Sequence, residues 1–284
     1  MTVEANAKIN LTLEVYARRP DGYHALRSLV APISLADTLE IEHSEDGSFA
    51  SDTGFEDDLC VKAARALFEC SSCAIARKKR SGVRIRVTKR IPVGGGLGGG
   101  SADAAAVLRA LNVLWKLGKS PEELAEIGVA VGSDVPALVL AQHYRQTVLM
   151  EGRGEKVSLF DIASPWSGDL PVPQSNGRTA HLILANPGVA VSTAEIFRLC
   201  TPRAVPAAMP VNDLQEPATR RHPEIARTLA ALESAGATDV RMSGSGATCF
   251  GFVPDATSSE RIVATLFRSG LYAWPARILT APLG

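Results

Sequence analysis

The chain has 284 residues, of which 46% are hydrophobic and 21% are charged, as is typical of a globular protein with one large or two ordinary domains. Its formal net charge is +0, so no overall field points to nucleic acid or to a membrane as a partner. The apolar runs are far shorter than a membrane span, and the N-terminus has no secretory pattern. We therefore expect a cytoplasmic protein whose five cysteines are reduced: Cys60, Cys70, Cys73, Cys200 and Cys249.

The first predicted element is a strand over residues 3–15. Its odd-numbered residues are apolar and its even-numbered residues are polar, so each kind occupies one face. Lys8 and Asn10 project side by side from the polar face. Taken alone, such a face is typical of a strand that borders solvent.

A turn follows over residues 18–22, marked by Pro-Asp-Gly. Extended segments at 28–33 and 37–42 predict an antiparallel N-terminal sheet, and residues 58–69 predict an amphipathic helix. A basic cluster leads to the next strand, and it either attracts a polyphosphate or forms a solvated face. Its members are Arg77, Lys78, Lys79, Arg80, Arg84, Arg86, Lys89 and Arg90.

The most informative stretch is a glycine loop over residues 92–103, in which six of the eight residues from Gly94 to Ser101 are glycine. An alternating strand at 83–91 precedes it. A helix rich in Ala, Leu and Val follows, with Ser101 as the expected N-cap and Asp103 in the first turn. Free backbone N–H groups and the positive end of a helix dipole suit an anion. The loop therefore predicts a phosphate cradle.

Other interpretations of the glycine loop are weaker. A Walker A loop ends in Gly-Lys-Ser/Thr, and no lysine lies between Lys89 and Lys116. The spacing Gly94-x-Gly96-x-x-Gly99 satisfies the dinucleotide fingerprint, but that fingerprint normally follows a buried parallel strand, whereas this strand alternates with Arg and Lys. A flexible linker would seldom join a strand to a capped helix.

The rest of the chain alternates helices and strands. We expect helices at 120–131, opened by a capping box, at 223–234 and at 259–269, and a short helix capped by Ser192 or Thr193. Strands are expected at 181–185, at the end of a small-residue loop within 240–252, and from residue 272. Residues 161–180 indicate a long loop. These elements predict an α+β fold.

Three segments resemble motifs of the GHMP kinases, a family named after galactokinase, homoserine, mevalonate and phosphomevalonate kinases. They are the glycine loop, Gly132-Ser-Asp-Val-Pro136, and the loop that contains Ser243-Gly-Ser-Gly246. The resemblance implies a two-domain GHMP kinase fold with the active site in the cleft between domains. The domains would be residues 1–150, which bind ATP phosphates, and residues 151–284.

Two further segments resemble one branch of that family, which phosphorylates diphosphocytidyl-methylerythritol. They are Ala5-Asn-Ala-Lys-Ile-Asn-Leu-Thr-Leu13 and Arg19-Pro-Asp-Gly-Tyr-His24. The resemblance implies ATP and Mg²⁺ as cofactors and that small molecule as the substrate. No nucleic acid, membrane or obligate protein partner is inferred.

The same resemblance assigns the site residues. Lys8 and Asp134 would be catalytic, although Asp134 alone would be interpreted as an N-cap or turn residue. Asn10, Tyr23, His24 and Thr193 would bind the substrate. ATP would be bound by Pro92, Gly94, Gly95, Gly96, Leu97, Gly98, Gly99, Gly100, Ser101 and Ala102, with Ser243, Gly244, Ser245 and Gly246 in the third-motif loop. The Mg²⁺ ligands are not identified.

One departure from the branch concerns the substrate base. The branch often supplies a second aromatic ring after its Pro-Gly turn, where this chain has Val189-Ala-Val191. Other functions stay open: a homoserine or mevalonate kinase, a non-catalytic binding protein of the same fold, and a nicotinamide-dependent dehydrogenase. Intact Lys8 and Asp134 argue against the non-catalytic alternative.

Overall fold

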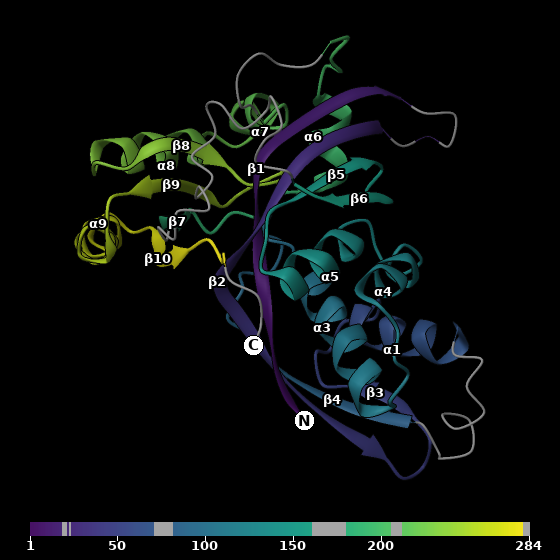
Figure 1. Ribbon diagram of the computed structural model, residues 1–284. Coiled ribbons are helices and arrows are strands. Elements are labelled where there is room, and N and C mark those ends of the chain that lie inside the picture. Colours follow the sequence, from purple (N-terminus) through teal and green to yellow (C-terminus); the bar gives the residue numbers. More distant parts are fainter. Residues whose placement is uncertain (19–21, 23, 71–81, 161–179, 206–211, 281–284) are drawn as a thin grey trace.

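The protein is built around two antiparallel-rich sheets, each covered by helices (Figure 1). This mixture of strands and helices confirms the predicted α+β class. No helix in the described part of the chain is long and apolar enough to cross a membrane. The computed structural model describes residues 1–18, 22, 24–70, 82–160, 180–205 and 212–280.

The first sheet is organised by a long antiparallel pair, β1 (Thr2–Arg18) and β2 (His24–Ser44). The two extended segments predicted at 28–33 and 37–42 are parts of the single strand β2. Its other edge pairs with β4 at one end and with β5 at the other. The remaining strands are β3 (Phe49–Ser51), β4 (Gly82–Thr88), β5 (Val148–Gly152) and β6 (Lys156–Leu159).

Four helices pack with the first sheet around one hydrophobic core. They are α1 (Leu59–Cys70), α3 (Gly99–Leu114), α4 (Pro121–Gly128) and α5 (Val135–Tyr144). The predicted capping box is present in α4, where Ser120 and Glu123 each accept the other's backbone N–H. Small side chains let α3 pack closely, because Ala104, Ala105 and Ala106 are all fully buried.

The second sheet has the order β10-β7-β9-β8 and is antiparallel throughout. Both faces of β7 are buried: Leu182 and Leu184 join the core of the first sheet, and Ile183 and Ala185 join a second core. Its strands are β7 (His181–Asn186), β8 (Thr238–Met242), β9 (Cys249–Val253) and β10 (Tyr272–Arg277). Its helices are α6 (Thr193–Leu199), α7 (Gln215–Arg221), α8 (Pro223–Ser234) and α9 (Ala256–Arg268).

Strand β1 ties the two sheets together. Its end packs Leu13 and Val15 into the second core, and their carbonyls accept hydrogen bonds from Asp213 N at 2.9 Å and Arg203 N at 2.7 Å. The first sheet itself continues through β6 to Leu159. The domain division at residue 150 stays a prediction, and the loop predicted at 161–180 lies, apart from Ala180, outside the described residues.

The polar face of β1 is covered and does not border solvent. Asn6, Lys8, Asn10, Thr12 and Glu14 are all buried. The register between β1 and β2 shifts on both sides of the segment from Lys8 to Asn10, and such bulges re-aim side chains beside active sites. Buried polar groups must be compensated: Asn6 donates to Ile33 O, and Thr12 Oγ1 accepts from Leu29 N.

The glycine loop and the third-motif loop meet backbone to backbone. Thr248 N donates to Gly95 O at 3.1 Å, and Ser243 Oγ donates to Gly96 O at 2.9 Å. Gly96 has a φ of +77°, and a Cβ built on it would lie 2.2 Å from Ser243 O. Only glycine therefore allows the two loops to approach this closely.

We expect Gly96→Ala to lower the free energy of unfolding by about 3 kcal/mol or more, because left-handed strain and a backbone clash add together. Gly94→Ala is the matched control, since Gly94 has a φ of +68° but a Cβ there meets nothing within 4 Å. That variant should lose only roughly 1 kcal/mol. Urea unfolding measures both, and equal losses would contradict the proposed contact between the loops.

Candidate active site

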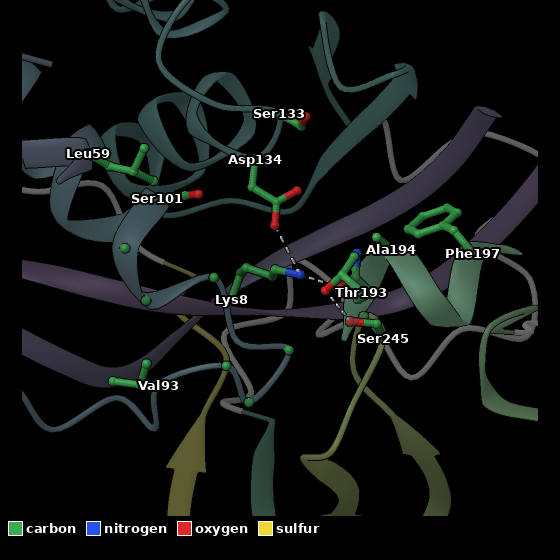
Figure 2. A pocket seen from close by; sticks show the side chains of 18 of the residues that line it. Lys8, Leu59, Val93, Ser101, Ser133, Asp134, Thr193, Ala194, Phe197 and Ser245 are labelled. Atoms are coloured by element: carbon green, nitrogen blue, oxygen red, sulfur yellow. Dashed lines mark hydrogen bonds and ion pairs between the residues drawn. The ribbon is translucent and has the colours of Figure 1, made fainter. Parts of the chain in front are cut away.

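A cavity of about 1060 Å³ lies where the glycine loop, β1 and the start of α5 face the second sheet's loops (Figure 2). Most of the predicted site residues line it. From the glycine loop these are Pro92, Gly94, Gly95, Gly96, Gly98, Gly99, Gly100 and Ser101; from elsewhere they are Lys8, Asn10, His24, Asp134, Thr193, Gly244 and Ser245. Tyr23 lies outside the described residues.

Four predicted residues have a supporting position instead. Leu97 and Ala102 are fully buried in the first core, where they anchor the glycine loop from behind. Ser243 is also fully buried and connects β1 to the glycine loop. Gly246, in the third-motif loop, faces Met242, because a Cβ built on it would lie 2.8 Å from Met242 Sδ.

The helix after the glycine loop begins earlier than predicted. Its N-cap is Gly98, with a φ of +68°, and Ser101 lies inside the first turn. The expectation that Ser101 is the N-cap is therefore wrong, because a left-handed glycine ends the loop three residues sooner. This shift leaves the Ser101 hydroxyl on the cavity wall at the positive end of the α3 dipole.

Lys8 and Asp134 meet across the cavity. Lys8 Nζ lies 3.4 Å from Asp134 Oδ2, with the two side chains 5% and 32% exposed. Asp134 occupies the N-cap position of α5, yet its side chain caps no backbone N–H. Its carboxylate is instead directed at the lysine, as Figure 2 shows. The pair thus combines a buried ammonium with a carboxylate that a ligand can reach.

The backbone around Lys8 is fixed by the glycine loop. Lys8 N donates to Leu97 O at 3.1 Å. A Cβ on Gly98 would lie 3.1 Å from Lys8 Cε, so the glycine lets the aliphatic part of the lysine lie flat against the loop. The ammonium is consequently held at the edge of the predicted phosphate cradle.

Asn10 was predicted to bind the substrate, and in the structure it also contacts Lys8 and Ser243. Its Oδ1 accepts from Lys8 Nζ at 2.5 Å, and its backbone N donates to Ser243 Oγ at 3.2 Å. Asn10 still lines the cavity, but it is 2% exposed. The amide therefore contacts the lysine directly.

The other end of the cavity carries polar and aromatic groups. Thr193 Oγ1 and Ser245 Oγ lie 2.8 Å apart, and Ser192, rather than Thr193, caps α6. The rings of His24 and Phe197 are stacked, with centroids 5.9 Å apart and an interplanar angle of 20°. Both rings line the cavity. Phe197 was missed from the sequence, although its i, i+4 spacing from Thr193 places both on one helix face.

On the far side of the glycine loop the cavity wall includes three apolar side chains. Phe55, Leu59 and Val93 line it there, and Phe55 and Val93 are 52% and 69% exposed. In Figure 2, Leu59 and Val93 lie on the opposite side of the Lys8 ammonium from Phe197. The cavity thus offers two surfaces for flat rings, with the Lys8–Asp134 pair between them.

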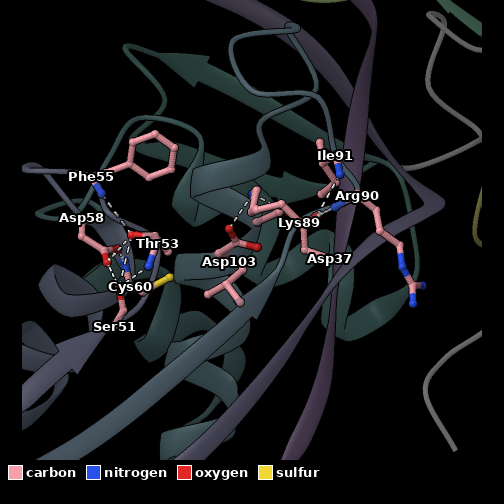
Figure 3. Close-up of polar contacts among 12 residues, drawn as sticks. Asp37, Ser51, Thr53, Phe55, Asp58, Cys60, Lys89, Arg90, Ile91 and Asp103 are labelled. Atoms are coloured by element: carbon pink, nitrogen blue, oxygen red, sulfur yellow. Dashed lines mark hydrogen bonds and ion pairs between the residues drawn. The ribbon is translucent and has the colours of Figure 1, made fainter. Parts of the chain in front are cut away.

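A buried ionic cluster fixes both ends of the glycine loop (Figure 3). Asp37 Oδ1 accepts from the backbone N atoms of Arg90 and Ile91, at 2.5 and 2.8 Å. Lys89 Nζ bridges Asp37 Oδ2 and Asp103 Oδ2, at 2.5 and 2.8 Å. Lys89 precedes the loop and Asp103 follows it, so this bridge spans the loop.

Asp103 therefore does not serve the helix terminus, as the sequence suggested. It is 2% exposed and paired with Lys89, and the expectation of a first-turn residue is wrong because α3 begins at Gly99. Burial raises the pKa of Asp103 to about 7, an effect that the Lys89 ammonium opposes and the Asp37 carboxylate strengthens. A carboxyl with this pKa keeps its proton more readily in the folded protein than in the unfolded chain.

The raised pKa of Asp103 predicts how the stability of the protein depends on pH. Because the folded pKa of Asp103 exceeds the unfolded value near 3.8, its contribution to stability is full below pH 4 and is lost as the pH rises to about 7. The unfolding free energy of the wild type relative to Asp103→Asn should fall across this interval. Urea unfolding at several pH values checks this. Asp57→Asn, at an 80% exposed side chain, is the control, and parallel wild-type and Asp103→Asn curves would contradict the assignment.

Comparison with known proteins identifies the family of the chain. The model for the GHMP kinases N terminal domain matches residues 58–142, and that for the GHMP kinases C terminal matches residues 202–272. The chain is 31% identical to a 4-(cytidine 5'-diphospho)-2C-methyl-D-erythritol kinase of known crystal structure, with a TM-score of 0.79 and coverage of 98% of this chain and 99% of that one. A mevalonate kinase structure shares the fold, at 13% identity and a TM-score of 0.67 over 99% of each chain.

Curated relatives match over nearly the whole length. One from Symbiobacterium thermophilum is 36% identical over 98% of this chain and 100% of the relative. Another, from Parvibaculum lavamentivorans, is 38% identical over 96% of each. Both are called 4-diphosphocytidyl-2-C-methyl-D-erythritol kinase. The chain therefore belongs to the GHMP kinase family, in the group formed by the 4-diphosphocytidyl-2-C-methyl-D-erythritol kinases.

Proposed function

We propose that this enzyme transfers the γ-phosphoryl group of ATP to the 2-hydroxyl of 4-diphosphocytidyl-2-C-methyl-D-erythritol, in the non-mevalonate route to isoprenoid precursors. The observation that carries the proposal is the Lys8–Asp134 pair at 3.4 Å, between a phosphate cradle and a surface for a second ring. Phosphoryl transfer needs little covalent chemistry from a protein. It needs aligned reactants, neutralised charge and a partner for the hydroxyl proton, and the cavity offers a group for each.

The roles of the two paired residues follow from their charges. Asp134 accepts the proton of the attacking hydroxyl, or orients that hydroxyl, with its 32% exposed carboxylate. Lys8 donates from its buried ammonium toward the phosphoryl oxygens, where negative charge accumulates in the transition state. Exclusion of water around Lys8 strengthens that interaction.

The ATP phosphates lie, in this proposal, along Gly94 to Ser101. The free N–H groups at the start of α3 bind the phosphate oxygens, and the adenine packs between Phe55, Leu59 and Val93. The Ser101 hydroxyl and the Asp134 carboxylate are oxygen donors of the kind that Mg²⁺ prefers, and they line the same cavity. Mg²⁺ bound to the phosphates would neutralise part of their charge.

The cytidine moiety fits the other end of the cavity. Phe197 supplies an aromatic ring that the segment after the Pro-Gly turn, at residues 189–191, lacks, and it comes from the next helix. We propose that the cytosine ring stacks on Phe197 and contacts His24. Tyr23, outside the described residues, stays a predicted substrate ligand. The hydroxyls of Thr193 and Ser245 lie 2.8 Å apart in the same cavity, and we propose that they bind the polyol or a phosphate.

The proposed compartment is the cytoplasm. Cys60, Cys70, Cys200 and Cys249 are free thiols, which suits a reducing environment and an enzyme that uses ATP. Cys73 lies outside the described residues.

Asp134→Asn should lower kcat by roughly 100- to 10,000-fold, because the amide cannot accept the hydroxyl proton. KM for both substrates should change little. ADP release with Mg-ATP measures this, and Glu126→Gln, at an exposed carboxylate on α4, is the control. Wild-type turnover of mevalonate or homoserine, but not of the cytidyl substrate, would overturn the proposed substrate. Full activity in Asp134→Asn would overturn only the role of that residue.

Phe197→Ala should raise KM for the cytidyl substrate by about 5- to 100-fold, since stacking on an aromatic ring contributes about 1–3 kcal/mol per base. KM for ATP should stay within a factor of about two. Phe197→Tyr keeps the ring and should behave like the wild type. Leu199→Ala is the matched control, because Leu199 is a 53% exposed residue of the same helix. A change in KM for ATP alone would place the cytosine elsewhere.

A further inference from the structure

Ser28 is a fully buried residue of β2 that lines no part of the cavity, yet it lies two hydrogen bonds from the Lys8 ammonium. Asn10 Nδ2 donates to Ser28 Oγ at 2.7 Å, and Ser28 Oγ donates to Thr12 O at 2.6 Å. The chain of contacts therefore runs from the Thr12 carbonyl through Ser28 and Asn10 to Lys8. Every group in it is buried.

The direction of each hydrogen bond in this chain is determined by chemistry. A carbonyl only accepts, so the single Ser28 proton points to Thr12 O, and Ser28 Oγ must accept from its other neighbour. That neighbour is then the NH₂ end of the Asn10 amide. The opposite end, Oδ1, consequently faces Lys8 Nζ, which can only donate.

The alternative orientation of the amide would be unfavourable at both ends. A rotated Asn10 would direct its NH₂ group at the Lys8 ammonium and its oxygen at Ser28. The ammonium would then face a donor in a site that is 5% exposed and screened from water. Without the Ser28 hydroxyl, only the Lys8 end of the amide would still favour the observed orientation.

The local backbone is built to bring Ser28 to this position. The register between β1 and β2 shifts between Asn10 and Thr12, and Leu29 N donates to the Thr12 hydroxyl at 3.1 Å. Arg241 Nη1 donates to the carbonyl of Leu11 within the bulge, at 2.8 Å. Polar groups of the bulge thus receive hydrogen bonds from both sheets. The Thr12 carbonyl is left to accept from Ser28 Oγ.

We propose that Ser28 is a positioning residue for phosphoryl transfer: it fixes the orientation of the Asn10 amide, which in turn holds the Lys8 ammonium beside Asp134. The kinetic consequence rests on the proposed function. The structural consequence, an immobilised Lys8 ammonium, does not depend on turnover.

The first test measures the Lys8 side chain in the free enzyme. In protein labelled with ¹³C-lysine, the two ε protons of Lys8 should have distinct NMR shifts, because the ammonium is held in one position; Lys8→Met assigns the signal. In Ser28→Ala the two shifts should approach each other, and in Ser28→Thr, which keeps a hydroxyl, they should stay distinct. Unchanged shifts in Ser28→Ala would overturn the proposal, whatever the substrate proves to be.

The second test separates positioning from stability. Ser28→Ala should lower kcat by roughly 10- to 100-fold, as expected for a displaced catalytic group, with KM for ATP and for the alcohol within about threefold. Ser259→Ala is the matched control, because Ser259 is also buried and donates to a backbone carbonyl, that of Leu182, away from the site. It should lose stability without losing kcat. An equal loss of kcat in Ser28→Ala and Ser259→Ala would contradict the proposal, because it would show that Ser28 contributes only to stability.

A double-mutant cycle tests the route through Asn10. If Ser28 acts only through that amide, Ser28→Ala should lower kcat no further in an Asn10→Leu background. Independent, multiplying effects would contradict the proposed chain of contacts.

Discussion

A lysine ammonium buried within a sheet is the constraint on which the rest of this structure depends. Lys8 is 4% exposed, and an unpaired charge at that depth would cost several kcal/mol. The protein compensates it with the Asn10 carbonyl oxygen and the Asp134 carboxylate. Both contacts come from elements that also form the cavity, so stabilising the lysine and assembling the site are the same structural task.

The glycine loop also combines a structural role with a position at the cavity. Its glycines line the cavity, and Leu97 and Ala102 are anchored in the core. Its two ends are joined by the Lys89 bridge between Asp37 and Asp103, and its middle rests on the third-motif loop. A loop rich in glycine is thereby held in one shape, which a preorganised phosphate site requires.

The predicted site residues that line the cavity come from segments around both sheets, and this arrangement suits a kinase with two extended substrates. The glycine loop and Asp134 lie in segments packed with the first sheet, whereas Thr193, Phe197 and Ser245 lie in segments packed with the second sheet. Strand β1 belongs to the first sheet, packs Leu13 and Val15 into the second core, and carries Lys8 and Asn10.

Local signals in the sequence predicted most of the secondary structure. The capping box at Ser120, the alternation in β1 and the glycine loop each depend on residues close together in the chain, so they could be identified without a structure. The N-cap of α3 could not be placed well, because several glycines compete for it and Gly98 takes the left-handed conformation.

Contacts between distant residues were less predictable. Burial of the polar face of β1 depends on loops more than 80 residues away in sequence, such as the one at Leu97. Asp103 was misinterpreted because its partners, Lys89 and Asp37, meet it only in the folded protein. The rings of Phe197 and His24 are stacked although the two positions differ by 173 in the sequence. The sequence pointed to Lys8 and Asp134 only through the family resemblance, and their side chains lie 3.4 Å apart in the structure.

The most direct test of this account is a crystal structure with Mg²⁺, a non-hydrolysable ATP analogue and diphosphocytidyl-methylerythritol. We predict that the 2-hydroxyl oxygen lies within hydrogen-bonding distance of the Asp134 carboxylate and in line with the γ-phosphate. Lys8 Nζ should contact a γ-phosphate oxygen while it keeps the Asn10 contact. A hydroxyl placed away from Asp134, or a Lys8 side chain that leaves Asn10 to bind elsewhere, would contradict the central claim.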